Sequence, residues 1–151
     1  MNLTVSHLDK LRLPLLHKIY KENYPSGKPK GKEEIIVIEG DKKILGAMRI
    51  KTYEECHFLT GMMIIKERRG ESLGSQLLFK LNEFLSLEHC YCFCEPQLSE
   101  FYLKNDFIHI DKKNIPYVLK SKHDRYTNTG KELDILLYKK LTIRYYSRQY
   151  P

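Results

Sequence analysis

The sequence predicts a single α/β domain whose sheet is mixed and mostly antiparallel, with a central pair of parallel strands flanked by helices. Short apolar runs bounded by turn residues follow one another over 34–65, which is typical of an antiparallel meander. A strand, an amphipathic helix and another strand then follow over 56–94, which predicts a right-handed crossover between parallel strands. The chain has 151 residues, a length that suits one hydrophobic core.

The first 32 residues are expected to hold a strand, a helix and a loop. Residues 2–5 fit a short edge strand, and residues 6–22 carry apolar side chains at helical spacing, with Ser6 as the N-cap. Pro14 predicts a kink or a division into two short helices. Residues 23–32 alternate prolines, glycines and lysines, so they are expected to form either a basic lip over a substrate site or a plain connection.

Three strands are expected next, over 34–39, 44–51 and 56–65. Gly40-Asp41 supplies the turn between the first two, and Gly61 predicts a bulge in the third. The remaining elements follow in order: a helix over 72–87, a strand over 90–94, a short helix after Pro96, a strand over 107–110, a helix over 115–126 and a strand over 132–141. A single domain is therefore expected over 1–141, with a basic, tyrosine-rich tail over 142–151.

A charged loop between strand and helix gives the clearest sign of a ligand. It reads Arg69-Gly70-Glu71-Ser72-Leu73-Gly74 and leads directly into the helical pattern. A glycine loop at a helix start offers unpaired backbone N–H groups and the positive end of the helix dipole, which favour a phosphate group. The separate P-loop pattern G-x-x-x-x-G-K-[ST] is absent from the sequence.

This loop resembles the pyrophosphate loop of the GNAT N-acetyltransferases, which bind acetyl-CoA with the pattern Arg/Gln-x-x-Gly-x-Gly/Ala. Arg69 and Gly74 match that pattern, whereas Ser72 replaces its first glycine and Lys66 replaces the usual preceding proline. A serine still offers its N–H group, and its hydroxyl is able to cap the helix or contact phosphate.

A second motif resembles the same family, whose members carry an asparagine and then Tyr-x-x-x-Gly-Phe. Tyr102 and Phe107 match, while Glu95 stands at the asparagine position and Asp106 at the glycine position. An ionised carboxylate at residue 95 can accept a hydrogen bond from pantetheine but cannot donate one. Aspartate adopts a left-handed backbone less readily than glycine.

The resemblance implies the GNAT fold, whose central parallel strands splay apart to admit the pantetheine arm. It also implies an acetyl-CoA-dependent N-acetyltransferase that transfers an acetyl group to a primary amine by direct attack. The backbone of the third strand of the meander is then expected to hydrogen-bond the pantetheine as an added strand would. The expected co-substrate-binding residues are Met62, Met63, Ile64, Arg69, Gly70, Glu71, Ser72, Leu73, Gly74, Ser75 and Glu95.

Two residues are candidates for catalysis. The tyrosine that matches Tyr102 lies near the sulfur in many GNAT enzymes and protonates the leaving thiolate; the alternative is that Tyr102 only packs or hydrogen-bonds CoA. His57 titrates near neutrality and is a candidate general base, directly or through water. Ordered water is the alternative base.

The four cysteines are interpreted as buried thiols in a reducing compartment. Cys90, Cys92 and Cys94 alternate along one strand, so neighbours on the shared face lie about 6.5 Å apart. Three such side chains cannot all reach one zinc ion at about 2.3 Å. No metal site and no disulfide are expected, and an acyl-cysteine route through Cys94 is not favoured.

The net charge of +7 is concentrated in the last quarter of the chain. Residues 111–151 hold 10 Lys and Arg against 4 Asp and Glu, whereas residues 1–110 hold 16 against 15. A solvated basic surface is the simplest interpretation, and an acidic acceptor, the phosphates of CoA or a nucleic acid are the alternatives.

No apolar run reaches the ~18–20 residues that span a bilayer, and the N-terminus lacks the pattern of a signal peptide. A cytoplasmic location without membrane partners is therefore the default expectation. The expected partners are acetyl-CoA and an amine acceptor of unknown identity, and the chain is expected to be a monomer or a homodimer. Two alternative functions stay open: a non-catalytic GNAT-fold module that binds an acyl-CoA, and a basic nucleic-acid-binding protein.

Overall fold

A computed structural model describes residues 2–139 of the chain, and these residues form two compact units. The first unit comprises the chain up to Thr52 together with Leu59–Phe84, and the second comprises Tyr53–Phe58 and the chain from Leu85 onward. Strand β4 (His57–Ile64) gives its first two residues to the second unit and the others to the first. The predicted tail over 142–151 lies outside the described residues.

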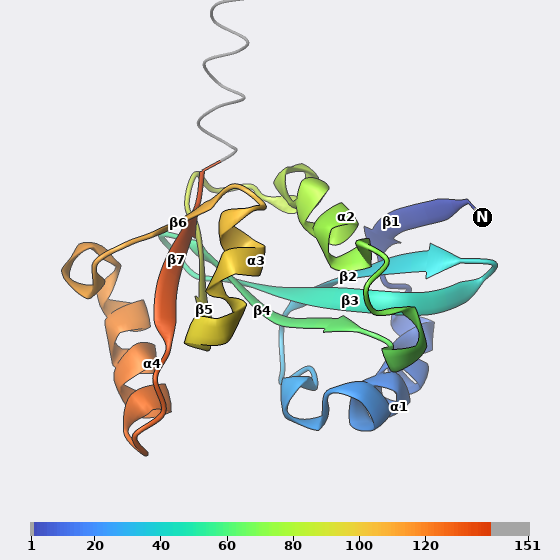
Figure 1. Cartoon of the computed structure of the whole chain (residues 1–151), viewed down its shortest axis with the longest axis horizontal. Coiled ribbons are helices and arrows are strands. Elements are labelled where there is room, and N and C mark those ends of the chain that lie inside the picture. The colour runs from blue at the N-terminus through green and yellow to red at the C-terminus, as the bar shows by residue number, and fades with distance from the viewer. Residues whose placement is uncertain (1, 140–151) are drawn as a thin grey trace, which may run out of the picture. The chain divides into compact units, whose positions relative to one another are not determined.

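The first unit contains strands in the order β1-β2-β3-β4 (Figure 1). Strand β1 (Leu3–His7) pairs with β2 (Glu34–Gly40), which pairs with β3 (Lys43–Thr52), and both pairings are antiparallel. Next to β3, the N–H group of Ile65 donates to the carbonyl of Leu45 at 2.9 Å. The antiparallel meander predicted for this region is therefore present.

The turn between β2 and β3 falls one residue later than predicted. Gly40 belongs to β2, and the turn residues are Asp41 (φ +52°) and Lys42 (φ +65°). Two successive left-handed residues are typical of the type I′ turn, whose twist matches that of the flanking strands.

The helix predicted over 6–22 begins later, because its first residues are used by other elements. Ser6, the expected N-cap, lies in β1 opposite Val37. A 3₁₀ helix over Lys10–Arg12 precedes α1 (Leu13–Asn23), so the division at Pro14 is the correct alternative. Pro14 lies in the first turn of α1, where a missing N–H group costs no hydrogen bond.

The helix predicted over 72–87 is also shorter. It consists of α2 (Leu73–Phe79) followed by a 3₁₀ helix over Leu81–Phe84. Leu78, Leu81 and Phe84 recur at every third residue, a spacing that aligns side chains on a 3₁₀ turn. Helices α1 and α2 lie on opposite faces of the strands in this unit (Figure 1).

The second unit contains strands in the order β5-β7-β6, all antiparallel. These are β5 (Cys90–Cys94), β6 (Phe107–His109) and β7 (Asp134–Tyr138). A 3₁₀ helix over Pro96–Leu98 leads into α3 (Ser99–Leu103), and another over Lys112–Asn114 precedes α4 (Tyr117–Thr127). The elements predicted for this part of the sequence are therefore present, with strands shorter by a few residues.

Side chains along β5 and β7 of the second unit point alternately to the two faces of the sheet. Tyr91 and Ile135 share a face with Leu119 of α4, and Cys56 and Phe58 join this cluster. The cysteines of β5 point to the other face, and all four thiols of the chain are free and buried. The mixed α/β class with a mostly antiparallel sheet agrees with the prediction. Among the described residues, no helix is long and apolar enough to cross a bilayer.

Candidate functional site

The loop between β4 and α2 has the backbone of a glycine loop although one glycine is replaced. Gly70 has φ +84°, and Ser72 has φ +64° and ψ +19°, both in the left-handed region. For a residue with a side chain this conformation costs roughly 1–2 kcal/mol. Ser72 therefore adopts a left-handed conformation, which glycine adopts without steric cost.

Arg69 holds this loop through its side chain. Its Nε donates to the carbonyl of Ile64 at 2.9 Å, and its Nη2 donates to the carbonyl of Asn23 at 3.1 Å. The Oδ1 atom of Asn23 in turn accepts the N–H group of Lys66 at 2.9 Å. These bonds connect Lys66 and Arg69 to the end of α1, so Arg69 holds the first half of the loop even though its side chain is exposed.

The start of α2 supplies backbone donors but only a short dipole. Helix geometry leaves the first N–H groups of an α-helix without intrahelical acceptors. The side chain of Ser72 makes no capping hydrogen bond, so the capping role considered for its hydroxyl is not seen. Leu73 and Gly74 are buried, and Gly70 and Glu71 are exposed, with Glu71 paired to Arg68 at 2.9 Å.

A buried polar network lies beside the left-handed residue of β4. Gly61 has φ +65°, in the left-handed region, and the bulge predicted at this residue stays a prediction. Its carbonyl accepts a hydrogen bond from the hydroxyl of Tyr20 at 2.6 Å. A Cβ atom on Gly61 would lie 2.4 Å from Nε of Arg49, so this position requires glycine for space as well as for conformation.

Arg49 and Glu33 form the ionic part of this network. Nη1 of Arg49 donates to both carboxylate oxygens of Glu33, at 2.7 and 2.6 Å, and their side chains are 5% and 6% exposed. Oε1 of Glu33 also accepts the N–H group of Lys30 at 2.9 Å. Sequence analysis missed these residues. A charged residue in the apolar strand over 44–51 was the available signal, because a buried charge requires a partner.

The strand residues expected to contact pantetheine follow Gly61 directly. Met63 is buried and packs against Leu16 and Tyr20 of α1, whereas Met62 and Ile64 are half-buried. Alternation along β4 thus places Met63 in the core and the other two on the opposite face.

Tyr102 lies in α3 of the second unit and is 9% exposed. Its ring makes edge-to-face contacts with Phe107, at 5.4 Å between centroids, and with Phe101, at 5.1 Å. Phe107 contacts Tyr138 in turn. Packing on several sides therefore fixes the position of the Tyr102 ring.

A short polar chain links β5, α3 and β7. The hydroxyl of Ser99 donates to Oδ2 of Asp134 and lies 3.5 Å from the sulfur of Cys94. Burial raises the pKa of the Cys94 thiol, although the Ser99 contact acts in the opposite direction. A protonated thiol is a weak nucleophile, which agrees with the interpretation that disfavours an acyl-cysteine route.

Glu95 stands at the asparagine position of the family motif, and its carboxylate already contacts two nearby side chains. Its carboxylate lies 3.3 Å from Nζ of Lys131 and accepts the side-chain amide of Gln97 at 2.6 Å. The carboxylate can accept hydrogen bonds in this arrangement but cannot donate one.

His57 is buried and acts as a hydrogen-bond acceptor. Its Nε2 accepts the N–H groups of Ser86 and Leu87, each at 3.0 Å. The accepting nitrogen carries no proton, so the ring proton is on Nδ1. These contacts give His57 a structural role in the segment before β5. The general-base role expected from sequence stays a prediction.

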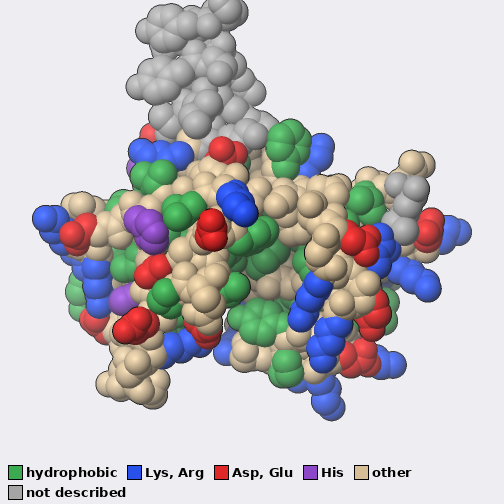
Figure 2. All heavy atoms as spheres, in the orientation of Figure 1, with side chains coloured by type: hydrophobic (Ala, Val, Ile, Leu, Met, Phe, Trp, Pro, Cys, Tyr) green, Lys and Arg blue, Asp and Glu red, His purple; other side chains and the backbone are tan. Residues whose placement is uncertain are grey.

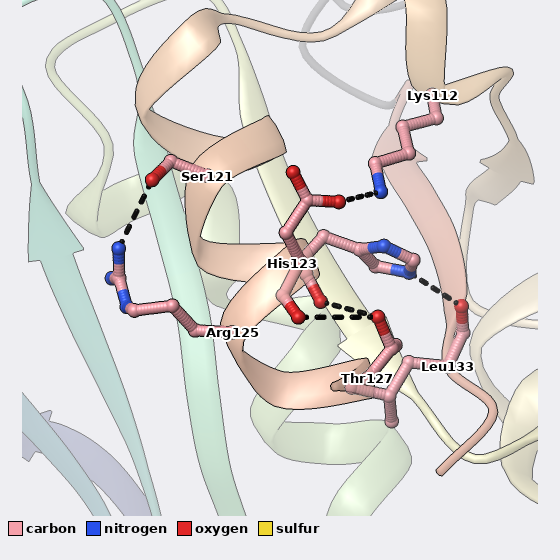
Figure 3. Close-up of polar contacts among 7 residues, drawn as sticks. Lys112, Ser121, His123, Arg125, Thr127 and Leu133 are labelled. Atoms are coloured by element: carbon pink, nitrogen blue, oxygen red, sulfur yellow. Dashed lines mark hydrogen bonds and ion pairs between the residues drawn. The ribbon is translucent and has the colours of Figure 1, made fainter. Parts of the chain in front are cut away.

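Helix α4 carries a polar surface, part of which is drawn in Figure 3. Lys112 pairs with Asp124, a ring nitrogen of His123 lies 2.9 Å from the carbonyl of Leu133, and Nη1 of Arg125 donates to Ser121 at 3.1 Å. These contacts pair basic groups of the last quarter with local partners.

On the visible face of the first unit, acidic and basic side chains are interspersed (Figure 2). No cluster of three His, Cys, Asp or Glu suited to a metal occurs within residues 2–139.

Comparison of this chain with protein-family models and with solved structures identifies its family and its fold. A family model described as Acetyltransferase (GNAT) domain matches residues 31–109, just over half of the chain. N-acetylglutamate synthase from Neisseria gonorrhoeae, complexed with coenzyme A and N-acetyl-glutamate, aligns with a TM-score of 0.74 and 12% identity. The alignment covers 91% of this chain but 35% of that enzyme, so the chain spans about a third of its length.

Two further solved structures are similar over most of their own length. The ribosomal-protein-S18-alanine N-acetyltransferase from Escherichia coli has a TM-score of 0.63 and 13% identity, covering 90% of this chain and 91% of that one. PaiA N-acetyltransferase from Thermoplasma acidophilum, in complex with coenzyme A, has a TM-score of 0.66 and 14% identity, covering 91% and 99%. None of the curated protein sequences compared with this chain matches it.

Proposed function

Because the chain belongs to the family of GNAT acetyltransferase domains, we propose that it is an acetyl-CoA-dependent N-acetyltransferase acting on a primary amine. One observation carries the proposal: the backbone is left-handed at both motif positions where the family uses glycine. These positions hold Ser72 (φ +64°) and Asp106 (φ +72°) here. A strained conformation kept at two motif positions by residues that disfavour it is typical of functional loops.

In this proposal the loop from Arg69 to Ser75 binds the pyrophosphate of CoA. Backbone N–H groups of the loop and the start of α2 donate to the phosphate oxygens, and Arg69 keeps them in place through its bonds to Ile64 and Asn23. The backbone of Met62, Met63 and Ile64 holds the pantetheine arm. Glu95 accepts a hydrogen bond from the same arm.

The proposed reaction is a direct attack. The acceptor nitrogen bonds to the thioester carbon, the C–S bond breaks, and the thiolate takes a proton from the hydroxyl of Tyr102. The attacking amine loses a proton to water or to His57, and the tyrosinate is then reprotonated from solvent. Such general acid–base steps typically contribute 10²–10⁴-fold to the rate. A single domain over 1–141 and a cytoplasmic location remain part of the proposal.

A non-catalytic acyl-CoA-binding module is the second candidate. The observation that favours it is the state of Glu95, whose carboxylate is held by Lys131 and Gln97 at the position of the family's asparagine. A module of this kind binds acetyl-CoA and releases no CoA with any amine.

One experiment separates the two candidates. Calorimetry measures the binding of acetyl-CoA, and a thiol reagent measures CoA release with a panel of amines, polyamines and peptides. Binding together with amine-dependent release supports the enzyme. Binding without release across the panel supports the module, and the absence of binding at millimolar acetyl-CoA contradicts both.

A further inference from the structure

A pocket of about 810 Å³ lies within the first unit. It is bounded by the end of β1, the first half of α1, the segment 29–33, the start of β2 and the end of β3. Small-molecule sites typically enclose ~300–1,000 Å³, so the volume suits a small ligand. None of the residues proposed to bind the co-substrate lines this pocket.

The charge around the pocket is basic. His7, Lys10, His17 and Lys32 line it, together with the carboxylates of Glu33 and Glu34. Neither Lys10 nor Lys32 forms an ion pair in the described part of the chain. These two ammonium groups are therefore available to a ligand.

The carboxylate of Glu33 does not offset the charge of the two lysines, because it is already paired with Arg49. Arg49 donates to both of its oxygens and the N–H group of Lys30 donates to one of them. Glu34 is exposed and is the other carboxylate of the lining. The two lysines therefore exceed the one carboxylate of the lining that has no basic partner among the described residues.

Apolar side chains make up part of the pocket lining. They include Leu8, Leu13, Ile35 and Ile50. Leu8, Leu13 and Ile35 pack against the core of the first unit, and Ile50 is fully buried. A ligand that fits has a short apolar body and a negatively charged group that reaches the lysines.

The pocket is connected to β4 through one ion pair. Glu33 lines the pocket, its carboxylate holds Arg49, and Nε of Arg49 lies against Gly61. Gly61 directly precedes Met62, Met63 and Ile64. The side chains of Glu33 and Arg49 therefore lie between this pocket and the strand that the proposed function assigns to the pantetheine arm.

We propose that this pocket takes the acceptor, and that the acceptor is a small amine bearing a carboxylate or a phosphate group. This inference rests on the proposed acetyltransferase function. Lys10 and Lys32 bind the anionic group, the apolar wall takes the carbon chain, and the amine extends toward β4. The same geometry disfavours polyamines, because their additional ammonium groups would lie beside the two lysines.

The first test compares acceptors that differ only in the anionic group. The pairs are phosphoethanolamine with ethanolamine, and β-alanine with β-alaninamide. We expect kcat/KM to be about 10-fold or more higher for the anionic member, because the neutral member lacks the charged group that accepts hydrogen bonds from the lysines. Equal values within each pair, or a preference for spermidine or for an acidic peptide over these small amines, would overturn the inference.

Matched variants localise the effect. Lys10→Ala/Lys32→Ala removes two charges from the pocket, whereas Lys18→Ala/Lys30→Ala removes two exposed charges outside it, one from α1 and one from the segment before β2. We expect the first variant to reduce the preference for the anionic member to within about 2-fold and the second to keep it. An equal loss in both variants would show a general electrostatic effect and contradict the assigned pocket.

A binding measurement separates failure of this inference from failure of the proposed function. Phosphoethanolamine is titrated into isotopically labelled protein without acetyl-CoA, and backbone amide NMR shifts are followed. Shifts confined to residues 7–17 and 29–35 support the pocket even if no turnover is found. Turnover of other amines, with no shifts in these segments, contradicts the pocket and leaves the acetyltransferase proposal standing.

Discussion

The loop from Arg69 to Ser75 in the first unit and helix α3 in the second are proposed to serve one co-substrate, but they are stabilised differently. The loop is exposed over Gly70–Ser72 and is held by hydrogen bonds from Arg69 to backbone carbonyls. Helix α3 presents Tyr102, which is almost buried among aromatic rings. The loop therefore depends on backbone shape and tolerates Ser72, whereas α3 depends on the chemistry of one side chain.

Replacing the hydroxyl of Tyr102 is expected to give the largest effect. In Tyr102→Phe the ring contacts with Phe101 and Phe107 remain, so the melting temperature should change little. Loss of the proton donor should lower kcat by about 100-fold or more while the Kd for acetyl-CoA changes less than about 3-fold. Steady-state kinetics and calorimetry measure the two quantities. Tyr117→Phe, at an exposed site, is the control, and unchanged kcat in Tyr102→Phe would remove its acid role.

A substitution at His57, in the second unit, distinguishes a structural role of this residue from a general-base role. His57→Leu leaves the N–H groups of Ser86 and Leu87 without their acceptor, so the free energy of unfolding should fall by about 1–3 kcal/mol. Urea denaturation measures this change. The structural role predicts that kcat of the remaining folded enzyme is close to that of the unmodified protein. A 100-fold loss of kcat with unchanged stability would instead support the general-base role.

Glycine substitutions test whether both left-handed positions are strained. Ser72→Gly and Asp106→Gly should each raise the free energy of unfolding by about 1 kcal/mol, because glycine adopts positive φ without a steric cost. Thermal denaturation measures the gain. Gly130 already has positive φ, so Gly130→Ala should show the opposite sign at a site outside both motifs. A loss of stability in Ser72→Gly would mean that the serine side chain makes a contact worth more than the strain.

Alkaline pH should destabilise the second unit more than the first. Burial raises the pKa of the Cys56 thiol from 9.0 to about 11, and the pKa of Tyr91, Cys92 and Cys94 is raised as well, chiefly by burial. In the first unit, burial raises the pKa of Tyr20. Below pH 9 the Cys56 thiol is protonated in both states; between pH 9 and 11 only the unfolded state loses the proton, so stability falls with rising pH.

Hydrogen exchange at pH 8, 9 and 10, corrected for the intrinsic rate, measures where protection is lost. We expect β5 and β7 to lose protection before β2 and β3. In Cys56→Ala the fall of the unfolding free energy with pH should be less steep, because one titrating group is removed. An identical slope in this variant would show that Cys56 does not contribute to the fall of the unfolding free energy with pH.

Local periodicity and turn chemistry made most of the fold predictable. Short apolar runs bounded by turn residues predicted β2, β3 and β4. The errors occurred where two elements competed for the same residues. Ser6 suits an N-cap, but pairing with Val37 places it in β1. The apolar spacing through Phe84 suits both helix types, and the chain continues beyond α2 as a 3₁₀ helix.

The candidate site was predictable only where a motif spans a few adjacent residues. The loop and Tyr102 belong to such motifs. The network of Tyr20, Glu33, Arg49 and Gly61 joins segments up to 41 residues apart through side-chain hydrogen bonds, and local sequence patterns do not report such pairings. The pocket beside Lys10 and Lys32 was missed for the same reason, since its lining comes from three separate segments, 7–17, 29–35 and 50–52.

The burial of every cysteine has a practical consequence for labelling chemistry. Cys56, Cys90, Cys92 and Cys94 are all free and buried, and the whole sequence contains no others. Maleimides react with exposed thiolates, so a single cysteine introduced at exposed Thr129 should be modified selectively in the native protein. A spin label or fluorophore can therefore be attached to the second unit without removing a native cysteine.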